Sequence, residues 1–205
     1  PANVESVAWI AERKNLLYAF FYLAALIAYM RYLADGGRGR YLAALALFLL
    51  ALCSKAAAVT LPLALLLAEA HCRERLNADS LKRTLPFFAA AALFTALAVA
   101  VQSSGGRILT ARAPALLSFY LMKAVLPIDL SAVYPYGELL AAFKDAQLFY
   151  LLPALAFAAL FWAVRRRRDA AWGLAFFAVH LLPFISLIPV GGIIAADRYL
   201  YLPAI

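Results

Sequence analysis

Long apolar runs alternate with short polar and charged clusters along this chain. A helix needs about 20 mostly apolar residues to cross the hydrocarbon core of a bilayer, because each residue adds about 1.5 Å of length. The pattern is therefore typical of an all-α, polytopic integral membrane protein with one membrane domain over residues 1–205. The runs predict about six transmembrane helices, at residues 16–33, 41–53, 57–69, 85–101, 148–164 and 172–188.

The apolar stretch 41–69 is too long for one comfortable span, and Lys55 interrupts it. A lysine at the bilayer centre costs about 2.5–3.5 kcal/mol on insertion scales. Two short helices separated by a turn at Lys55 would place its ammonium at an aqueous face instead. The alternative topology makes 41–69 one span and residues 115–126 a second crossing, and it buries Lys55.

Basic residues fix the orientation, because cytoplasmic loops carry an excess of Lys and Arg. Loops 31–40, 70–84 and 165–168 hold 11 of the 19 Lys and Arg residues, so we place them in the cytoplasm. The alternative topology would put the basic loop 70–84 outside, which this rule disfavours. The remaining connecting segments then face the periplasm or lumen. They are residues 1–14, Lys55, 103–147 and 189–205, and the first of them is an amphipathic interfacial segment.

The outer loop 103–147 contains a short apolar helix, 115–126, that Pro127 ends, because proline removes a backbone donor and clashes with the preceding turn. Under the preferred topology this helix lies along the outer face. The chain starts without Met and ends where a new apolar run begins, and we interpret it as a piece of a longer protein.

Composition supports the membrane assignment, since 67% of residues are hydrophobic and only 15% are charged. Soluble domains carry about 25% charged residues. The net charge of +8 does not indicate nucleic-acid binding, because the basic residues form short clusters between apolar runs. Cys53 and Cys72 lie near opposite faces in this topology, so we expect no disulfide between them.

The candidate functional residues lie mostly on the predicted outer face. Arg13 and Lys14, next to Glu12, could hold a lipid phosphate, and the alternative is interfacial anchoring by snorkelling. Lys55 could meet a phosphate or leaving group, or simply form a polar turn. In Asp197-Arg198-Tyr199 the acid could orient the arginine toward a phosphate, or it could cap a helix start.

Two further residues have weaker claims. His180 lies within the last predicted span, where an ionisable group is a functional candidate by default, although a neutral histidine can simply bond a neighbouring helix. Asp129 in the outer loop is either functional or a turn former. No zinc motif, P-loop, Rossmann fingerprint or nucleophile elbow is present in the sequence, and we expect no metal-ligand set.

Three segments occur here in the order seen in one known group of proteins. They are VESVAWIAERKNLL, LALCSKAAAVTLPLALLL and IPVGGIIAADRYLYLP. The chain resembles the GT-C-type membrane glycosyltransferase domain of the transmembrane and TPR-containing protein O-mannosyltransferases and their bacterial relatives. The resemblance covers essentially the whole chain. It implies a partial GT-C-like bundle, with TPR repeats to follow in the full-length protein.

The resemblance also implies a reaction. A sugar, mannose in the eukaryotic proteins, would pass from a polyprenyl-phosphate donor to a protein Ser/Thr hydroxyl or another acceptor at the periplasmic or lumenal face. The acidic base of such enzymes would precede Pro1, so the catalytic residue is unknown and this piece alone should be inactive. By position, the resemblance matches Arg13 and Lys14 to the family's basic pair after the first outer loop and Lys55 to the lysine of its Ser-Lys turn. It matches Asp197, Arg198 and Tyr199 to the family's acidic-Arg-Tyr motif. The donor-phosphate candidates are Arg13, Lys14, Lys55 and Arg198, with Glu12, Asp197 and Tyr199 in support. A divalent cation is compatible with the reaction, but no residue requires one.

This family has Glu or Pro after the Ser-Lys turn, whereas Ala56 and Ala57 follow Lys55 here. The expected partners are the lipid-linked donor, the acceptor and the bilayer. The expected location is the bacterial inner membrane, or the endoplasmic reticulum in a eukaryote. Two other classes stay open: a lipid-linked-sugar transporter or flippase, with polar residues along its spans, and a non-catalytic membrane scaffold that binds partners through TPR repeats.

Overall fold

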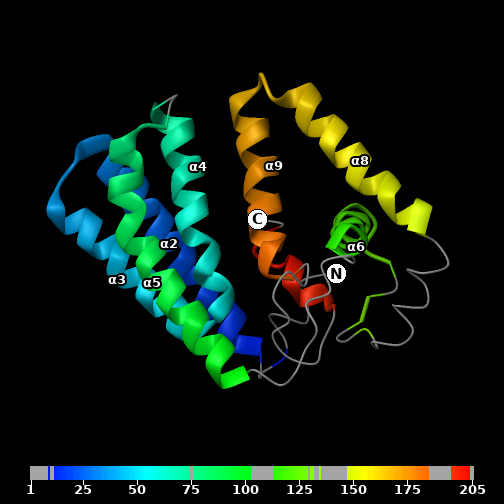
Figure 1. The fold of residues 1–205 in the computed structure, drawn as a ribbon, viewed down its shortest axis with the longest axis horizontal. Coiled ribbons are helices and arrows are strands. Elements are labelled where there is room, and N and C mark those ends of the chain that lie inside the picture. The colour runs from blue at the N-terminus through cyan, green and yellow to red at the C-terminus, as the bar shows by residue number, and fades with distance from the viewer. Residues whose placement is uncertain are drawn as a thin grey trace. The chain divides into compact units, whose positions relative to one another are not determined.

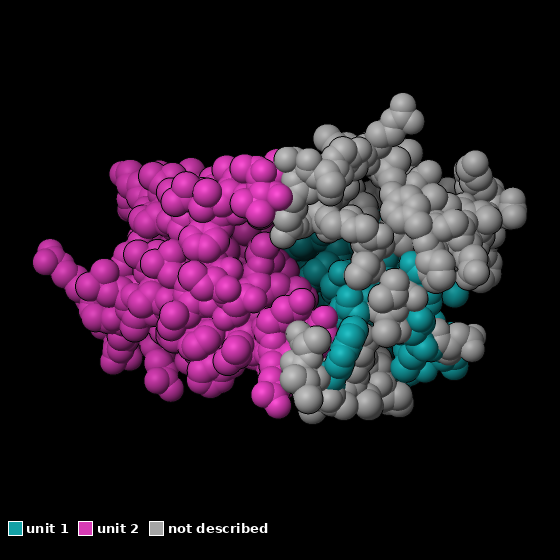
Figure 2. Space-filling view, turned by 90° about the horizontal axis from the view of Figure 1, so that it is seen from below, with its two compact units in different colours: residues 1–9, 102–205 teal, residues 10–101 magenta. Residues whose placement is uncertain are grey.

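The structure is a computed structural model, and it describes residues 9, 12–73, 76–102, 113–128, 130, 131, 134, 147–184 and 195–203. Regular structure within these ranges is helical, and one isolated antiparallel bridge pairs Tyr134 with Ala195. The all-α class expected from the sequence is confirmed. The chain divides into two compact units, coloured separately in Figure 2: unit 1, residues 1–9 and 102–205, and unit 2, residues 10–101.

The described part of unit 2 contains four α-helices that follow one another along the chain: α2 (Arg13–Asp35), α3 (Arg38–Ser54), α4 (Leu61–Arg73) and α5 (Ala78–Gln102) (Figure 1). Hydrogen bonds near the helix ends show that alternate helices run in the same direction. Tyr29 near the end of α2 donates to Glu69 near the end of α4 at 2.8 Å. Tyr41 at the start of α3 donates to the carbonyl of Arg83 near the start of α5 at 2.8 Å.

The core of unit 2 centres on the ring of Phe87, which is fully buried. The rings of Tyr29, Tyr41 and Phe48 lie around it, each with its centre 5.7 Å from that of Phe87. Tyr29 and Tyr41 meet this ring edge-to-face, and such pairs add about 0.5–1.5 kcal/mol to the gain from burial. The cluster therefore joins α2, α3 and α5 through side chains far apart in the sequence.

The turn between α2 and α3 consists of two glycines. Gly36 has φ 72° and Gly37 has φ 98°, which are backbone conformations that cost little only for glycine. The chain can therefore reverse within two residues, and the end of α2 meets the start of α3.

The break predicted at Lys55 is present. α3 ends at Ser54, Lys55 is extended with φ −158° and ψ 131°, and a 3-10 turn, η2 (Ala56–Thr60), leads into α4. The basic loop predicted over 70–84 is shorter than expected, because residues 70–73 continue α4 and residues 78–84 belong to α5. Asn77 explains part of this difference: its side chain accepts a hydrogen bond from the backbone N–H of Ser80 at 2.8 Å and so caps the start of α5.

The described residues of unit 1 form three α-helices. They are α6 (Ala113–Val125), α8 (Gln147–Val164) and α9 (Arg168–Leu181), followed by the 3-10 turns η4 (Leu182–Phe184) and η5 (Asp197–Leu200). A short turn over 165–167 joins α8 to α9, and α6 packs against α8 and η5. The α-helix predicted to end near residue 188 stops at Leu181, and residues 185–194 lie outside the described residues.

Three described helices are long and apolar enough to cross a membrane: Arg13–Asp35, Ala56–Arg73 and Ala78–Val101. Two shorter apolar helices, Leu116–Val125 and Leu152–Val164, accompany them. Many large apolar side chains on these helices are exposed, such as Phe20 at 65% and Leu93 at 60%. Lipid tails favour such a surface and water does not. These features indicate a membrane protein, while the number of six spans stays a prediction.

Candidate functional site

The first turn of α2 carries the basic pair that the sequence analysis singled out. Arg13 is exposed, and the side chain of Lys14 is 55% exposed. Glu12, directly before the helix, is only 4% exposed. A buried carboxylate needs partners, because loss of water penalises its ionised form. Glu12 accepts a hydrogen bond from Nδ2 of Asn15 at 2.6 Å, and its Oε1 lies 3.8 Å from Nζ of Lys14.

Lys55 joins this group from the turn between α3 and η2. Its ammonium donates a hydrogen bond to Oδ1 of Asn15 and lies 5.9 Å from the centre of the Tyr18 ring. Asn15 therefore bridges Glu12 and Lys55, donating to one and accepting from the other. Asn15 and Tyr18 are 1% and 4% exposed, so the bridge is shielded from water. We call Glu12, Lys14, Asn15, Tyr18 and Lys55 the Glu12 cluster.

The Glu12 cluster and Arg13 together can bind an anion. Three cationic side chains accompany one carboxylate, which leaves a net charge of +2. The start of a helix adds outward-facing N–H groups and the positive end of the helix dipole. Phosphate oxygens form strong charge-assisted bonds with such groups. Since the carboxylate of Glu12 repels anions, the exposed side of Arg13 and Lys14 is the favourable place for a phosphate.

In unit 1, Asp197 holds two distant segments together. Its Oδ2 accepts hydrogen bonds from the backbone N–H of Ser131 at 2.5 Å and from the hydroxyl of Tyr134 at 2.9 Å. The backbone N–H of Tyr134 donates to the carbonyl of Ala195 at 3.2 Å. Asp197 is 2% exposed, so these bonds offset the cost of burying its carboxylate.

Helix α6 supports the same region through Tyr120. The backbone N–H of Ala196 donates to the Tyr120 hydroxyl at 3.4 Å. Tyr120 is fully buried, and burial raises the pKa of its hydroxyl, which therefore stays neutral at physiological pH. We call Tyr120, Ser131, Tyr134 and Asp197 the Asp197 cluster.

Arg198 lies between aromatic rings beside the Asp197 cluster. Its guanidinium carbon is 5.7 Å from the centre of the Trp9 ring and 5.4 Å from that of Tyr199, and the residue is 7% exposed. Tyr199 in turn stacks on Phe184, with ring centres 4.3 Å apart. Cation–π contacts attract a guanidinium to such faces. The rings therefore help to set the direction of Arg198.

Asp197 is the first residue of the 3-10 turn η5, so an acid lies at a helix start, as one of the two interpretations of the Asp-Arg-Tyr segment expects. The other interpretation, in which Asp197 orients Arg198, stays a prediction. The carboxylate of Asp197 also accepts hydrogen bonds from Ser131 and Tyr134. Asp197 therefore holds the segment around Ser131 as well, which the local Asp-Arg-Tyr spacing does not indicate.

His180 is 1% exposed, and its Nδ1 lies 2.7 Å from the carbonyl of Phe176 one turn earlier. This local contact is the kind that a structural histidine makes. Asp129, the other weak candidate, lies outside the described residues.

Asn15, which bridges Glu12 to Lys55, is not among the residues predicted from the sequence. A signal was present, because Asn15 lies three residues after Glu12 and residues at this spacing share a helix face. The role of Ser131 could not be found in this way, since it uses a backbone N–H that every residue but proline has. The proposal that both clusters face the same side of the membrane stays a prediction.

Among the described residues, no group of three or more His, Cys, Asp or Glu is placed to hold a metal ion. Comparisons with known proteins give no match to a family model, to a curated protein or to a solved structure.

Proposed function

We propose that this chain is part of a GT-C-type membrane glycosyltransferase that takes a sugar from a polyprenyl-phosphate donor at the periplasmic or lumenal face. The observation that carries the proposal is the position of Lys55. The chain brings this lysine back to the first turn of α2, where its ammonium bonds Asn15, the residue directly after Arg13 and Lys14, although 40 positions separate Asn15 from Lys55 in the sequence. A donor with a phosphate at the membrane boundary needs such a group of cations.

The reaction assigns a role to each group. An acceptor hydroxyl attacks the anomeric carbon while a carboxylate, placed by the family resemblance before Pro1, takes its proton. The bond between the anomeric carbon and the phosphate oxygen breaks, and the electron pair leaves with the polyprenyl phosphate. Arg13, Lys14 and Lys55 stabilise the charge that develops on the phosphate. Arg198 is a further donor-phosphate candidate, which the family resemblance suggests.

The supporting residues position these cations. Glu12 and Asn15 hold Lys55 and limit its freedom to turn into water. Asp197 and Tyr199 support Arg198. Asp197 fixes the neighbouring backbone, and the ring of Tyr199 lies beside the guanidinium of Arg198. The acceptor is a protein Ser or Thr hydroxyl or a glycan, and the bilayer supplies the donor.

The test uses the full-length protein in membranes with a polyprenyl-phosphate-linked sugar as donor. K55Q should lower kcat/KM roughly 100-fold, because loss of one charge-stabilising donor has about this effect. N15A should lower it roughly tenfold through misplacement of Lys55, and R198A should impair turnover more than membrane abundance. R166Q, an exposed charge on the turn between α8 and α9, is the control and should leave transfer unchanged.

Normal transfer by K55Q and R198A at normal abundance would remove these residues from the proposal. Movement of the lipid-linked sugar across the membrane without transfer to an acceptor would favour a flippase instead. A protein that neither transfers nor moves the donor, but binds partner proteins, would favour the scaffold.

A further inference from the structure

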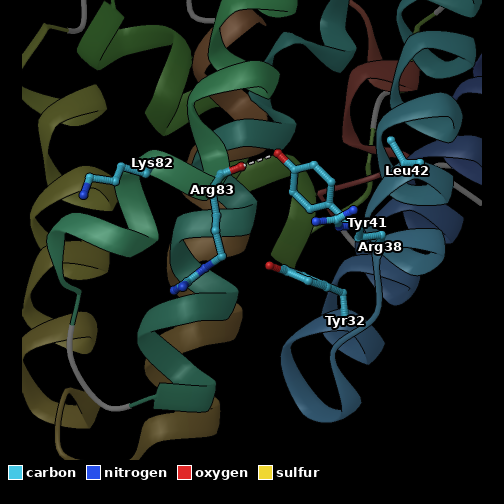
Figure 3. A pocket seen from close by; sticks show the side chains of 6 residues that line it. All are labelled: Tyr32, Arg38, Tyr41, Leu42, Lys82 and Arg83. Carbon is cyan, nitrogen blue, oxygen red and sulfur yellow. Dashed lines mark hydrogen bonds between the residues drawn. The ribbon is translucent and has the colours of Figure 1, made fainter.

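The opposite end of unit 2 contains a second group of cations, beside a pocket of about 450 Å³. The pocket lies where α2 ends and where α3 and α5 begin, as Figure 3 shows. Six residues line it: Tyr32, Arg38, Tyr41, Leu42, Lys82 and Arg83. Three of them are cationic, two are tyrosines and one is an exposed leucine. None belongs to the Glu12 or Asp197 cluster.

The walls of this pocket are held in place by contacts within unit 2. The rings of Tyr32 and Tyr41 lie 5.2 Å apart, and the hydroxyl of Tyr41 donates to the carbonyl of Arg83 at 2.8 Å. The guanidinium of Arg83 forms two hydrogen bonds with the buried carboxylate of Glu69, at 2.9 and 2.8 Å. The guanidinium of Arg83 is therefore largely occupied by its bonds to Glu69, and Arg38 and Lys82 are the more exposed cations.

Charge around the pocket is not balanced. Residues 31–42 and 69–83 carry seven Lys or Arg and four Asp or Glu, a net charge of +3. The acids near the pocket are largely engaged: Asp35 lies 2.9 Å from Arg40, and Asp79 lies 3.6 Å from Lys82. The Lys82 pair is highly exposed, so it is weak and an anion can displace it.

The position relative to the apolar helices indicates which anion fits. The lining residues lie within about two turns of the ends of α2, α3 and α5, where a spanning helix meets the headgroup layer. Tyrosines favour this layer. Leu42, which lines the pocket, is 61% exposed, and Leu85, about one turn after Lys82 on α5, is 59% exposed. Acyl chains cover such leucines better than water does.

We propose that this pocket binds the headgroup phosphate of an anionic phospholipid, with Arg38 on the phosphate, Tyr32 at its side and Leu42 against the acyl chains. Lys82, which points away from Arg38 in Figure 3, adds positive charge at the rim of the pocket. Basic pockets between transmembrane helices on the cytoplasmic side are suited to such lipids. By the charge rule this is the cytoplasmic end of unit 2, opposite the Glu12 cluster. The inference rests on membrane insertion and not on the proposed transferase activity.

The test measures binding of phosphatidylglycerol to the purified full-length protein in neutral detergent by native mass spectrometry. Phosphatidylcholine and soluble glycerol phosphate serve as the comparison ligands. R38Q/K82Q should weaken phosphatidylglycerol binding by more than about tenfold, since each cation near an anionic lipid surface contributes roughly fivefold. Both side chains are exposed, so the fold should survive. R166Q/R167Q removes the same charge from the exposed turn after α8 and should change binding by less than about threefold.

A second variant separates a lipid from a free phosphate. L42N should weaken phosphatidylglycerol binding and leave glycerol phosphate binding unchanged, because only the lipid has acyl chains to contact residue 42. Equal losses in R38Q/K82Q and R166Q/R167Q would show general surface electrostatics and overturn the proposal. Equal affinity for glycerol phosphate, or for phosphatidylcholine, would overturn it as well.

Discussion

The buried ion pair between Glu69 and Arg83 gives a sharp prediction about the stability of unit 2. Glu69 is fully buried, and its oxygens accept hydrogen bonds from Tyr29 at 2.8 Å, from Ser80 at 2.8 Å and from Arg83 at 2.9 and 2.8 Å. The E69Q substitution keeps the shape of the side chain and removes its charge. The guanidinium of Arg83, with a side chain only 20% exposed, then loses its partner and cannot fully rehydrate.

Breaking a buried ion pair by removal of one partner costs about 3–5 kcal/mol. The partial exposure of Arg83 lowers this cost, and the amide of glutamine keeps some of the hydrogen bonds. We therefore expect E69Q to reduce the free energy of unfolding by about 3 kcal/mol, and R83Q by a similar amount. The double variant should be less destabilised than the sum of the two, because its remaining groups are both neutral.

The assay is reversible unfolding of the purified protein in mixed micelles, followed by circular dichroism. R73Q is the control, because Arg73 is 43% exposed and lies 3.8 Å from the same carboxylate. It should cost less than about 1 kcal/mol. A loss under about 1 kcal/mol in E69Q, or full additivity of E69Q and R83Q, would refute the assignment of the pair as a stabilising link between α4 and α5.

Two further substitutions test the cores of the units. D197N should loosen the segment around Ser131 and speed its backbone hydrogen exchange, because the carboxylate accepts hydrogen bonds from Ser131 and Tyr134. Y134F removes only one hydroxyl and should have a smaller effect. Equal exchange in D197N and the parent protein would contradict this role of Asp197. F87A should lower the free energy of unfolding by about 3–5 kcal/mol, because the ring is fully buried among three aromatic rings. F20A removes a ring that is 65% exposed and should cost under about 1 kcal/mol, so equal losses in the two variants would place Phe87 outside the core.

The apolar runs alone were sufficient to predict most helices of this chain. The run before Arg31 predicted α2, the run after Leu148 predicted α8, and the lysine within 41–69 predicted the break after Ser54. These features are local, because an uninterrupted apolar run favours a helix and a charge inside it is costly in lipid. The extension of α5 back to Ala78 was not predicted, since it depends on the capping bond that the backbone N–H of Ser80 donates to the side chain of Asn77.

Only the tertiary structure decided which residues meet. Lys55 with Asn15, Glu69 with Arg83 and Asp197 with Ser131 are contacts between distant parts of the chain. In a soluble helix, the apolar face marks the side that packs inward. A helix surrounded by lipid can be apolar on every face, so this signal is lost, and the hydrophobic pattern cannot tell a buried ring from a lipid-facing one. The sequence by itself therefore determined most of the helices and the break at Lys55, whereas packing and capping contacts decided some helix ends and how the polar residues combine into sites.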